Sequence, residues 1–289
     1  MVETATLSAK LEVRRFDAPL GAEISGVDLS RPLDDALFAA IQRALLDHQV
    51  LVLRDQHCDD DSQVAFSRRF GRLQVHVLNQ YHSSNRPEVL LVSNLDAEGK
   101  PSGRHPDPGA CIWHTDGSWA KVPGKVTMLH GLEIPSEGGD TCFANMYAAY
   151  DALDPATKAT IETLRAVHDL NESRQRSAAL DQMTEEQKRA APPVEHPMVR
   201  VHPETGRKCI YLGQHAFTVA GMERAAGAAL VDRINRHATQ DRFVYRHRWR
   251  KGDLVMWDNR CVLHLATPYD TGRERRIIRR TTVNDDVAA

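Results

Sequence analysis

Several features that would assign a function at once are missing from this sequence. No apolar run approaches the ~20 residues of a membrane-spanning helix, and the N-terminus lacks the basic start and apolar core of a signal peptide. Neither sign of charge predominates, because 37 basic residues are balanced by 39 acidic ones. We therefore expect a cytoplasmic protein that has neither nucleic acid nor a membrane as its partner.

Cysteine is scarce, and no Cys-x-x-Cys pair occurs. The five cysteines are Cys58, Cys111, Cys142, Cys209 and Cys261. Because they are odd in number and widely spaced, they are typical of reduced thiols in a cytosol.

Glycine-rich phosphate-binding loops are also absent, since neither Gly-x-Gly-x-x-Gly nor Gly-x-x-x-x-Gly-Lys occurs. An apolar fraction of 42% is enough for a core, and 289 residues could form one large barrel-like domain or two smaller ones. A helical opening is followed by short strands broken by glycine and proline, with helices inserted between them. This order favours a mainly β fold with a jelly-roll core, one domain over residues 1–289, over a doubly wound α/β sheet.

Periodicity and terminal signals place the individual elements. The predicted helices cover residues 37–45, 59–70, 146–164 with a break at Pro155, and 222–237. The predicted strands cover residues 49–54, 89–92, 126–134, 208–212, 243–249, 253–257, 261–265 and 276–283. Asp34 and Asp35 are expected to cap the first helix, and Gly71 to end the second.

The segment 170–197 is rich in Arg, Gln, Glu and Ala and closes with Pro192-Pro193. Two interpretations fit it about equally. It is either part helix and part mobile cover over an active site, or a surface insertion with no role.

His114 and Asp116 are the first candidate metal ligands. Two residues apart, they share one face of an extended segment and could bind one metal ion. The pattern is weak, because the chain contains other His-x-Asp/Glu triplets, at His57, His105 and His202, which we interpret as ordinary surface polar residues. Taken alone, the pair fits a metal site and a half-buried polar strand end equally well.

A third ligand should come from far along the chain, because a jelly roll brings distant strands together at its mouth. His264 is our choice, since it closes an apolar strand after a probable turn, although a lone histidine there is more often a core residue.

Two arginines near the C-terminus strengthen the case for a binding site. Arg276 and Arg280 lie four residues apart and would face the same way on a strand, at roughly 13 Å separation, while Arg275 and Arg279 face the other side. Inward arginines need anionic partners, which are either bound ligands or the chain's own carboxylates.

Together, these motifs resemble those of the iron(II)- and 2-oxoglutarate-dependent dioxygenases typified by taurine dioxygenase and 2,4-dichlorophenoxyacetate dioxygenase. The similarity extends from Gly21 to Thr282. The motifs that carry it are His114-Thr115-Asp116, Gly138-Gly139-Asp140-Thr141, Trp257-Asp258-Asn259-Arg260 with His264, and Arg275 to Arg280.

The resemblance implies a double-stranded β-helix in which His114, Asp116 and His264 bind iron and leave coordination positions open. It also implies that the far carboxylate of the cosubstrate 2-oxoglutarate meets Arg276 and Thr141, a guanidinium fork and a hydroxyl that both suit a carboxylate. In the family, 2-oxoglutarate and dioxygen yield succinate and carbon dioxide while the substrate is hydroxylated.

Substrate residues also follow from the resemblance. Arg280 matches the arginine that receives the substrate's anionic group, and His76 matches a substrate-binding histidine of taurine dioxygenase. Ala110 replaces an asparagine found in many members, which leaves more apolar room. We therefore expect a small anionic organic substrate, of the aryloxyalkanoate type with ether cleavage; an alkylsulfonate or alkyl sulfate, releasing sulfite or sulfate, is the alternative. A homo-oligomer is expected.

Two other classes of protein are alternatives to a dioxygenase. A cupin-type metalloenzyme would also be a barrel, but it would show clustered histidines and no need for Arg276 and Thr141. A non-catalytic anion-binding protein would explain the arginines, but it would not need the three metal ligands.

Overall fold

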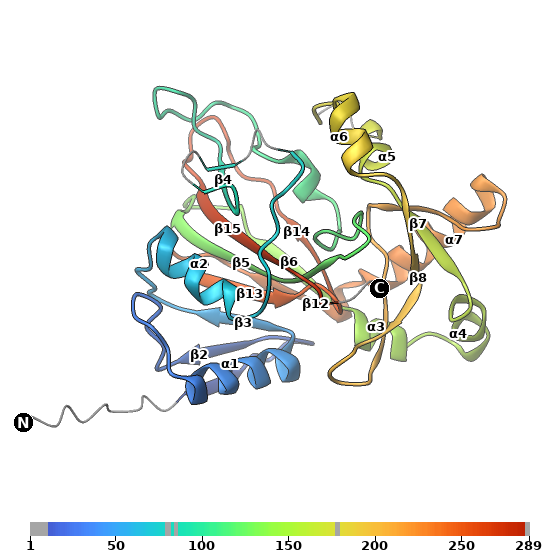
Figure 1. Cartoon of the computed structure of the whole chain (residues 1–289), viewed down its shortest axis with the longest axis horizontal. Helices are drawn as coiled ribbons and strands as arrows, with labels where there is room; N and C mark the ends of the chain where they lie inside the picture. Colours follow the sequence, from blue (N-terminus) through green and yellow to red (C-terminus); the bar gives the residue numbers. More distant parts are fainter. Residues whose placement is uncertain (1–10, 79–81, 84–85, 177–179, 287–289) are drawn as a thin grey trace, which may run out of the picture.

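Two facing β-sheets form the centre of the protein in the computed structural model, which describes residues 11–78, 82–83, 86–176 and 180–286 (Figure 1). The large sheet has the order β1 (Glu12–Arg15), β2 (Ala22–Ser25), β3 (Val50–Leu53), β13 (Leu254–Asp258), β5 (Gly124–Glu133), β15 (Ile277–Asn284) and β4 (Val89–Ser93). The smaller sheet has the order β12 (Val244–His247), β6 (Thr141–Asn145) and β14 (Val262–Ala266). Only β2 and β3 run parallel among these named neighbours. The predicted mainly β jelly-roll core is confirmed.

The centre of the large sheet is buried on both faces, which explains why β3 is an unbroken apolar run. Val50 and Val52 point into the core shared with the smaller sheet, while Leu51 and Leu53 point to the opposite core. Successive side chains of a strand face opposite ways, so a strand covered on both sides cannot alternate apolar with polar residues. Trp257 of β13 fills the space between the sheets, with its ring 5.3 Å from that of Phe143.

Two helices cover the outer face of the large sheet (Figure 1). They are α1 (Asp35–His48) and α2 (Asp60–Arg68). As predicted for the first helix, Asp34 caps α1, and Asp59 caps α2 in the same way; each side chain accepts a hydrogen bond from a backbone N–H of the first turn. Gly71 follows α2 with a positive φ of 142°, which suits glycine.

A further layer lies beyond the smaller sheet. It contains the sheet β11 (Ala216–Val219), β7 (Arg165–His168), β8 (Val194–Pro197), the pair β10 (Lys208–Ile210) and β9 (Val199–Val201), and the helices α3 (Met146–Asp151), α4 (Pro155–Ile161), α5 (Leu170–Gln175), α6 (Glu185–Ala190) and α7 (Arg224–Ala238). Pro155 does begin a new helix, as expected. Strands β7, β8, β9 and β11 were not predicted, because they are only three or four residues long.

Two further expectations, on the cysteines and on membrane-spanning segments, can be compared with this fold. All five cysteines are free thiols, as expected. None of the helices within the described ranges has the length and apolar character needed to cross a membrane.

Gly227 provides a test of how α7 packs on β11. A glycine inside a helix ordinarily costs about 1 kcal/mol relative to alanine. Here, however, a Cβ at position 227 would lie only 2.7 Å from the backbone nitrogen of Val219. We therefore expect Gly227→Ala to lower the free energy of unfolding by about 1–3 kcal/mol through overpacking, measured by urea denaturation.

The matched control is Ala229→Gly on the exposed face of the same helix, which should lower the free energy of unfolding by about 1 kcal/mol through helix propensity alone. A stabilised Gly227→Ala variant would contradict the close packing of α7 on β11.

Candidate metal centre and substrate pocket

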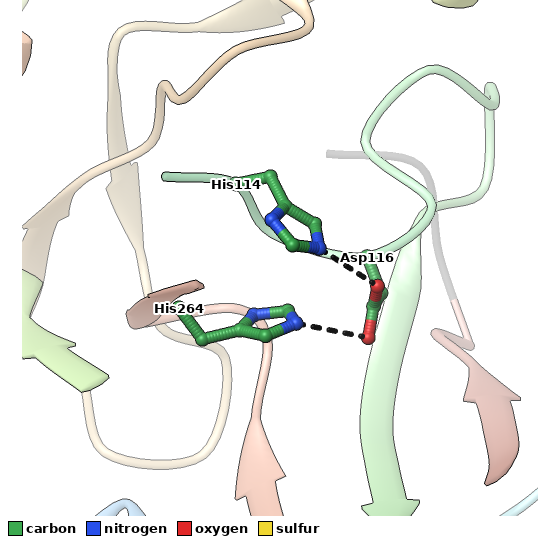
Figure 2. Close-up of side chains that lie close together, drawn as sticks. All are labelled: His114, Asp116 and His264. Carbon is green, nitrogen blue, oxygen red and sulfur yellow. Dashed lines mark ion pairs between the residues drawn. The ribbon is translucent and has the colours of Figure 1, made fainter. Parts of the chain in front are cut away.

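Two distant segments meet at the mouth of the barrel. His114 and His264 form an antiparallel bridge, in which His114 N donates to His264 O at 2.9 Å and His264 N donates to His114 O at 2.7 Å. Asp116 completes the group: its Oδ1 lies 3.7 Å from His114 Nε2 and its Oδ2 lies 3.8 Å from His264 Nε2 (Figure 2). All three side chains are buried, and one ligand atom of each lies within 4.8 Å of the others. The predicted trio therefore comes together.

The protonation states of these groups suit a divalent metal ion. His114 Nδ1 lies 2.7 Å from the carbonyl oxygen of Ile112, so Nδ1 must donate, which leaves Nε2, the nitrogen that faces Asp116, as the ring atom placed to bind a metal. Burial, together with His114, holds the pKa of His264 well below its ordinary value, which keeps that imidazole neutral. Burial opposes ionisation of Asp116, but the Arg280 guanidinium, the two histidines and the Thr127 hydroxyl together outweigh it, so the carboxyl pKa is lowered. Two neutral imidazoles and one carboxylate are a donor set that iron(II) accepts.

A closed set of hydrogen bonds fixes Asp116. Thr127 Oγ1 donates to Asp116 Oδ2 at 2.6 Å and accepts from Asn259 Nδ2 at 2.9 Å. Asn259 Oδ1 accepts from the backbone N–H of Asp116 at 3.1 Å and from Trp257 Nε1 at 2.9 Å. Asn259 therefore links the backbone and the carboxylate of Asp116 to the turn between β13 and β14.

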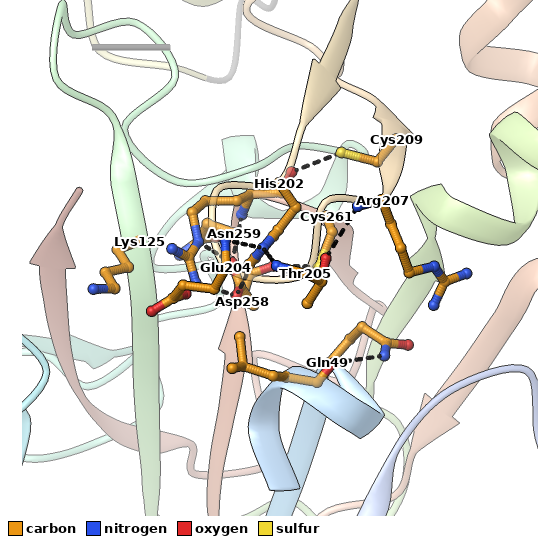
Figure 3. A network of polar contacts seen from close by, with 12 residues as sticks. Gln49, Lys125, His202, Glu204, Thr205, Arg207, Cys209, Asp258, Asn259 and Cys261 are labelled. Carbon is orange, nitrogen blue, oxygen red and sulfur yellow. Dashed lines mark hydrogen bonds and ion pairs between the residues drawn. The ribbon is translucent and has the colours of Figure 1, made fainter. Parts of the chain in front are cut away.

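That turn is anchored by a buried charge network (Figure 3). Arg260 donates from Nε to Asp258 Oδ1 at 2.8 Å and from Nη2 to Asp258 Oδ2 at 2.6 Å. Glu204 also accepts from Arg260, and His202 Nε2 lies 3.0 Å from Asp258 Oδ2. The interpretation of His202 as a surface residue was wrong, because its ring is 1% exposed and packs under the turn.

His202, Asp258 and Cys261 are also close enough together to suggest a metal site. Both carboxylate oxygens of Asp258 are already engaged by Arg260, however, and burial raises the pKa of the Cys261 thiol well above its ordinary value. A protonated thiol and a saturated carboxylate are poor ligands. This cluster therefore positions Asn259 rather than binding an ion.

A narrow cavity leads from the trio to Arg276 and Thr141, so the two predicted cosubstrate residues lie together beside the candidate metal site. Arg276 is 3% exposed, its Nε has no hydrogen-bond partner, and burial lowers its pKa to about 10. Thr141 Oγ1 accepts from Trp249 Nε1 at 3.0 Å, which leaves its own proton to donate. Gly139, with a φ of 65°, allows the close approach, since a Cβ there would lie 3.2 Å from Arg276 Nε.

The neighbouring arginines have protein partners. Arg275 pairs with Glu133 at 2.5 Å and Arg279 with Asp60 at 2.6 Å. Arg280 pairs with Asp116 Oδ1 at 2.8 Å. Arg276 alone of these four has no carboxylate within ion-pair distance among the described residues. The chain's own acids therefore satisfy three of the arginines and leave Arg276 for a ligand.

A larger cavity of about 420 Å³ adjoins the narrow one and is also lined by His114 and Asp116. Both predicted substrate residues, His76 and Arg280, line it. Burial and the nearby Arg280 lower the pKa of His76 to about 3, so this ring is neutral. The apolar part of the wall comes from Leu78, Leu90, Leu91, Leu170, Leu180 and Trp119.

Two polar residues of this wall, His215 and Arg174, were not predicted. Burial lowers the pKa of His215 to about 3, and its Nδ1 lies 2.9 Å from Ser173 Oγ. No motif surrounds either residue in the sequence, so only the fold brings them to the cavity. The surface interpretation of His105 was also wrong, since its half-buried ring lines the narrow cavity beside Arg276.

The segment 170–197 contributes to the larger cavity through Leu170, Ser173, Arg174 and Leu180. Its end is not a loose insertion, because Val194–Pro197 forms β8 and pairs with β7. Residues 177–179 of the predicted cover lie outside the described residues.

Comparisons with known proteins agree with this geometry. Residues 12–282 match the family described as "Taurine catabolism dioxygenase TauD, TfdA family". The chain is 39% identical over 274 residues to an alpha-ketoglutarate-dependent 2,4-dichlorophenoxyacetate dioxygenase of Cupriavidus pinatubonensis, covering 92% of this chain and 95% of that protein. It is 34% identical over 296 residues to an alpha-ketoglutarate-dependent sulfate ester dioxygenase of Pseudomonas putida, covering 98% and 93%. The crystal structure of AAD-2 in complex with Mn(II) and N-oxalylglycine superposes with a TM-score of 0.81 at 35% identity, covering 96% of this chain and 99% of that one.

The hydroxyl of Thr127 should tune metal affinity. Thr127→Val keeps the shape of the side chain but removes the donor to Asp116 Oδ2. We expect it to weaken Mn(II) binding about 10- to 100-fold, measured by calorimetry.

Thr281→Val is the matched control. Thr281 is equally buried, and its hydroxyl contacts Ser67 and Gln63 instead of Asp116. Equal losses of Mn(II) affinity in the two variants would contradict a specific role for Thr127.

Proposed function

This chain belongs to the TauD, TfdA family of dioxygenases, and from that membership we propose that it hydroxylates a small aryloxyalkanoate-type acid and cleaves its ether bond. The enzyme depends on iron(II), 2-oxoglutarate and dioxygen. The observation that carries the proposal is the convergence of His114, Asp116 and His264 beside the unpaired, buried Arg276. Membership of this family argues against the two alternative classes, a cupin-type metalloenzyme and a non-catalytic anion-binding protein.

In this proposal the residues of the barrel mouth divide the work. His114, Asp116 and His264 hold iron(II), and Arg276 with Thr141 receives the far carboxylate of 2-oxoglutarate. When bound, the metal and its cosubstrates supply the oxidation, in which 2-oxoglutarate and dioxygen become succinate and carbon dioxide and one oxygen atom is placed on a substrate carbon. A hydroxylated carbon that bears an ether oxygen then separates into a carbonyl compound and a phenol.

The remaining residues bind and shield the substrate. His76 and Arg280 are proposed to receive its anionic group, with the neutral imidazole as a hydrogen-bonding partner and the guanidinium as a charge. The apolar wall, including Trp119 and Leu180, excludes water and accepts an aromatic body. Ala110 lines both cavities and adds no polar contact there.

A sulfate ester or an alkylsulfonate is the second candidate substrate. The relative from Pseudomonas putida acts on sulfate esters, and a guanidinium fork binds a sulfate or sulfonate as readily as a carboxylate. The aryloxyalkanoate is preferred because the identity to the 2,4-dichlorophenoxyacetate enzyme, 39%, exceeds the 34% to the sulfate ester enzyme.

Three further features belong to the proposal. The segment 170–197 is proposed as an active-site cover, supported by the four side chains that it contributes to the larger cavity. A cytoplasmic location is supported by the free thiols. Organisation of residues 1–289 as one domain and assembly into a homo-oligomer stay predictions.

The substrate is tested by a panel of aryloxyalkanoates, alkylsulfonates and alkyl sulfates, scored by succinate formed in the presence of iron(II) and 2-oxoglutarate. We expect the highest kcat/KM with an aryloxyalkanoate, accompanied by release of a phenol. Asp116→Ala serves as the inactive control. Turnover of sulfates or sulfonates alone would reject the aryloxyalkanoate and support the second candidate substrate.

The role of Arg276 is tested by Arg276→Gln. Loss of the buried charge should raise the KM for 2-oxoglutarate about 10- to 100-fold, the size of a lost charge-assisted hydrogen bond, and leave the KM for the substrate nearly unchanged. The adjacent Arg275→Gln is the control, because Arg275 pairs with Glu133 at the surface. Equal increases in both KM values would show that Arg276 does not bind the cosubstrate.

A further inference from the structure

Arg174 is a buried cation that the site described so far does not use. It lies on α5, is 5% exposed and lines the larger cavity together with His76, His215 and Arg280. Its Nε donates to the carbonyl oxygen of Asp181 at 2.6 Å. Its Nη2 is buried without a hydrogen-bond partner, and no carboxylate of the described residues forms an ion pair with it.

A buried guanidinium without an anion is energetically costly, because the charge loses its hydration and gains nothing in return. Arg280, the other arginine that lines this cavity, avoids this cost because it pairs with Asp116. Arg176, two residues after Arg174, pairs with Glu172 at the surface. Arg174 is therefore the cation of the cavity wall whose charge stays uncompensated by the described part of the chain.

The other polar groups of the wall do not neutralise Arg174. His76 and His215 both have a pKa lowered to about 3, so at neutral pH neither contributes charge. Asp107 also lines the cavity, but its Oδ1 accepts from the backbone N–H of Gly109 at 3.1 Å, and it lies beyond ion-pair distance of Arg174. The partner of Arg174 must therefore enter the cavity from outside.

We propose that Arg174 is a specificity-determining residue that binds the anionic group of the substrate, in addition to Arg280. With Nε engaged by Asp181, its two terminal nitrogens are left to donate in parallel to two oxygens of a carboxylate or sulfate. The leucines and Trp119 accept the apolar body of the same molecule. This inference rests on the proposed function and narrows its substrate to an organic monoanion with a bulky apolar part.

The test is a comparison of charged and neutral ligands. Binding of phenoxyacetate and of its neutral counterpart phenoxyacetamide to the protein loaded with Mn(II) and N-oxalylglycine is measured by calorimetry, for the wild type, Arg174→Gln, Arg174→Lys and the control Arg176→Gln. Hexyl sulfate and hexanol form a second pair that separates sulfate from carboxylate recognition. Affinity for N-oxalylglycine, measured on every variant, shows whether the rest of the site is intact.

In the wild type the acid should bind at least about tenfold more tightly than the amide. Arg174→Gln should reduce that preference several-fold with little change in amide affinity, leaving the share that Arg280 supplies. Arg174→Lys should lose less of the preference, and Arg176→Gln should keep all of it. The proposal is overturned if Arg174→Gln weakens acid and amide equally, if it leaves the preference intact, or if the wild type shows no preference in either pair.

Failure of the broader function looks different. Absence of succinate formation with every acid of the panel, combined with a reduced anion preference in Arg174→Gln, would refute the reaction and retain the role of Arg174. If the enzyme turns over the acid and Arg174→Gln leaves the KM for the acid unchanged, only the role of Arg174 is refuted.

Discussion

Two reciprocal backbone hydrogen bonds between His114 and His264 are the constraint on which the site depends. They join segments 150 residues apart and place the two imidazole rings 4.0 Å from each other, centroid to centroid. The turn after Asp116 can close only because Gly124 has no side chain, since a Cβ there would lie 2.5 Å from the Asp116 carbonyl oxygen. Position is thus set by backbone, and the side chains of Thr127 and Asn259 refine it.

The arginines around this centre fall into two groups, those paired with carboxylates of the chain and those that are unpaired. Arg260 is saturated by Asp258 and Glu204 and anchors a turn, whereas Arg275 and Arg279 have surface or rim partners. A paired buried arginine has its charge compensated within the fold, while an unpaired one keeps the full desolvation cost that an anionic ligand would offset. By this criterion Arg276 and Arg174 differ from the other arginines described above, and they line two adjoining cavities that have His114, Asp116 and Arg280 in common.

The sequence predicted the parts of the fold whose pattern is local. Strands β3, β13 and β14 are apolar runs, and Asp34 and Asp59 cap helices by short-range hydrogen bonds, so both kinds of element could be predicted from neighbouring residues. The seven site residues were found because their motifs occur in a familiar order, and the structure brings them to the two cavities.

The sequence did not predict which residues are buried by contacts with distant parts of the chain. His202 was predicted to lie at the surface because a His-Pro-Glu sequence is typical of an exposed turn. Its ring is buried instead, in contact with Asp258, which is 56 residues away in the sequence. His215 and Arg174 carry no local signature at all, and only the packing of α5 and the segment before β11 brings them to the cavity. The same applies to the short strands β7 and β8, which are stabilised by their neighbours and not by their own composition.

The placement of the cysteines has a consequence for durability. Burial raises the pKa of all five thiols, so at neutral pH each remains protonated. Only the thiolate reacts readily with peroxide and related oxidants. An enzyme that brings ferrous iron and oxygen together is exposed to such oxidants, and this chain keeps its most oxidisable sulfur atoms in their least reactive form.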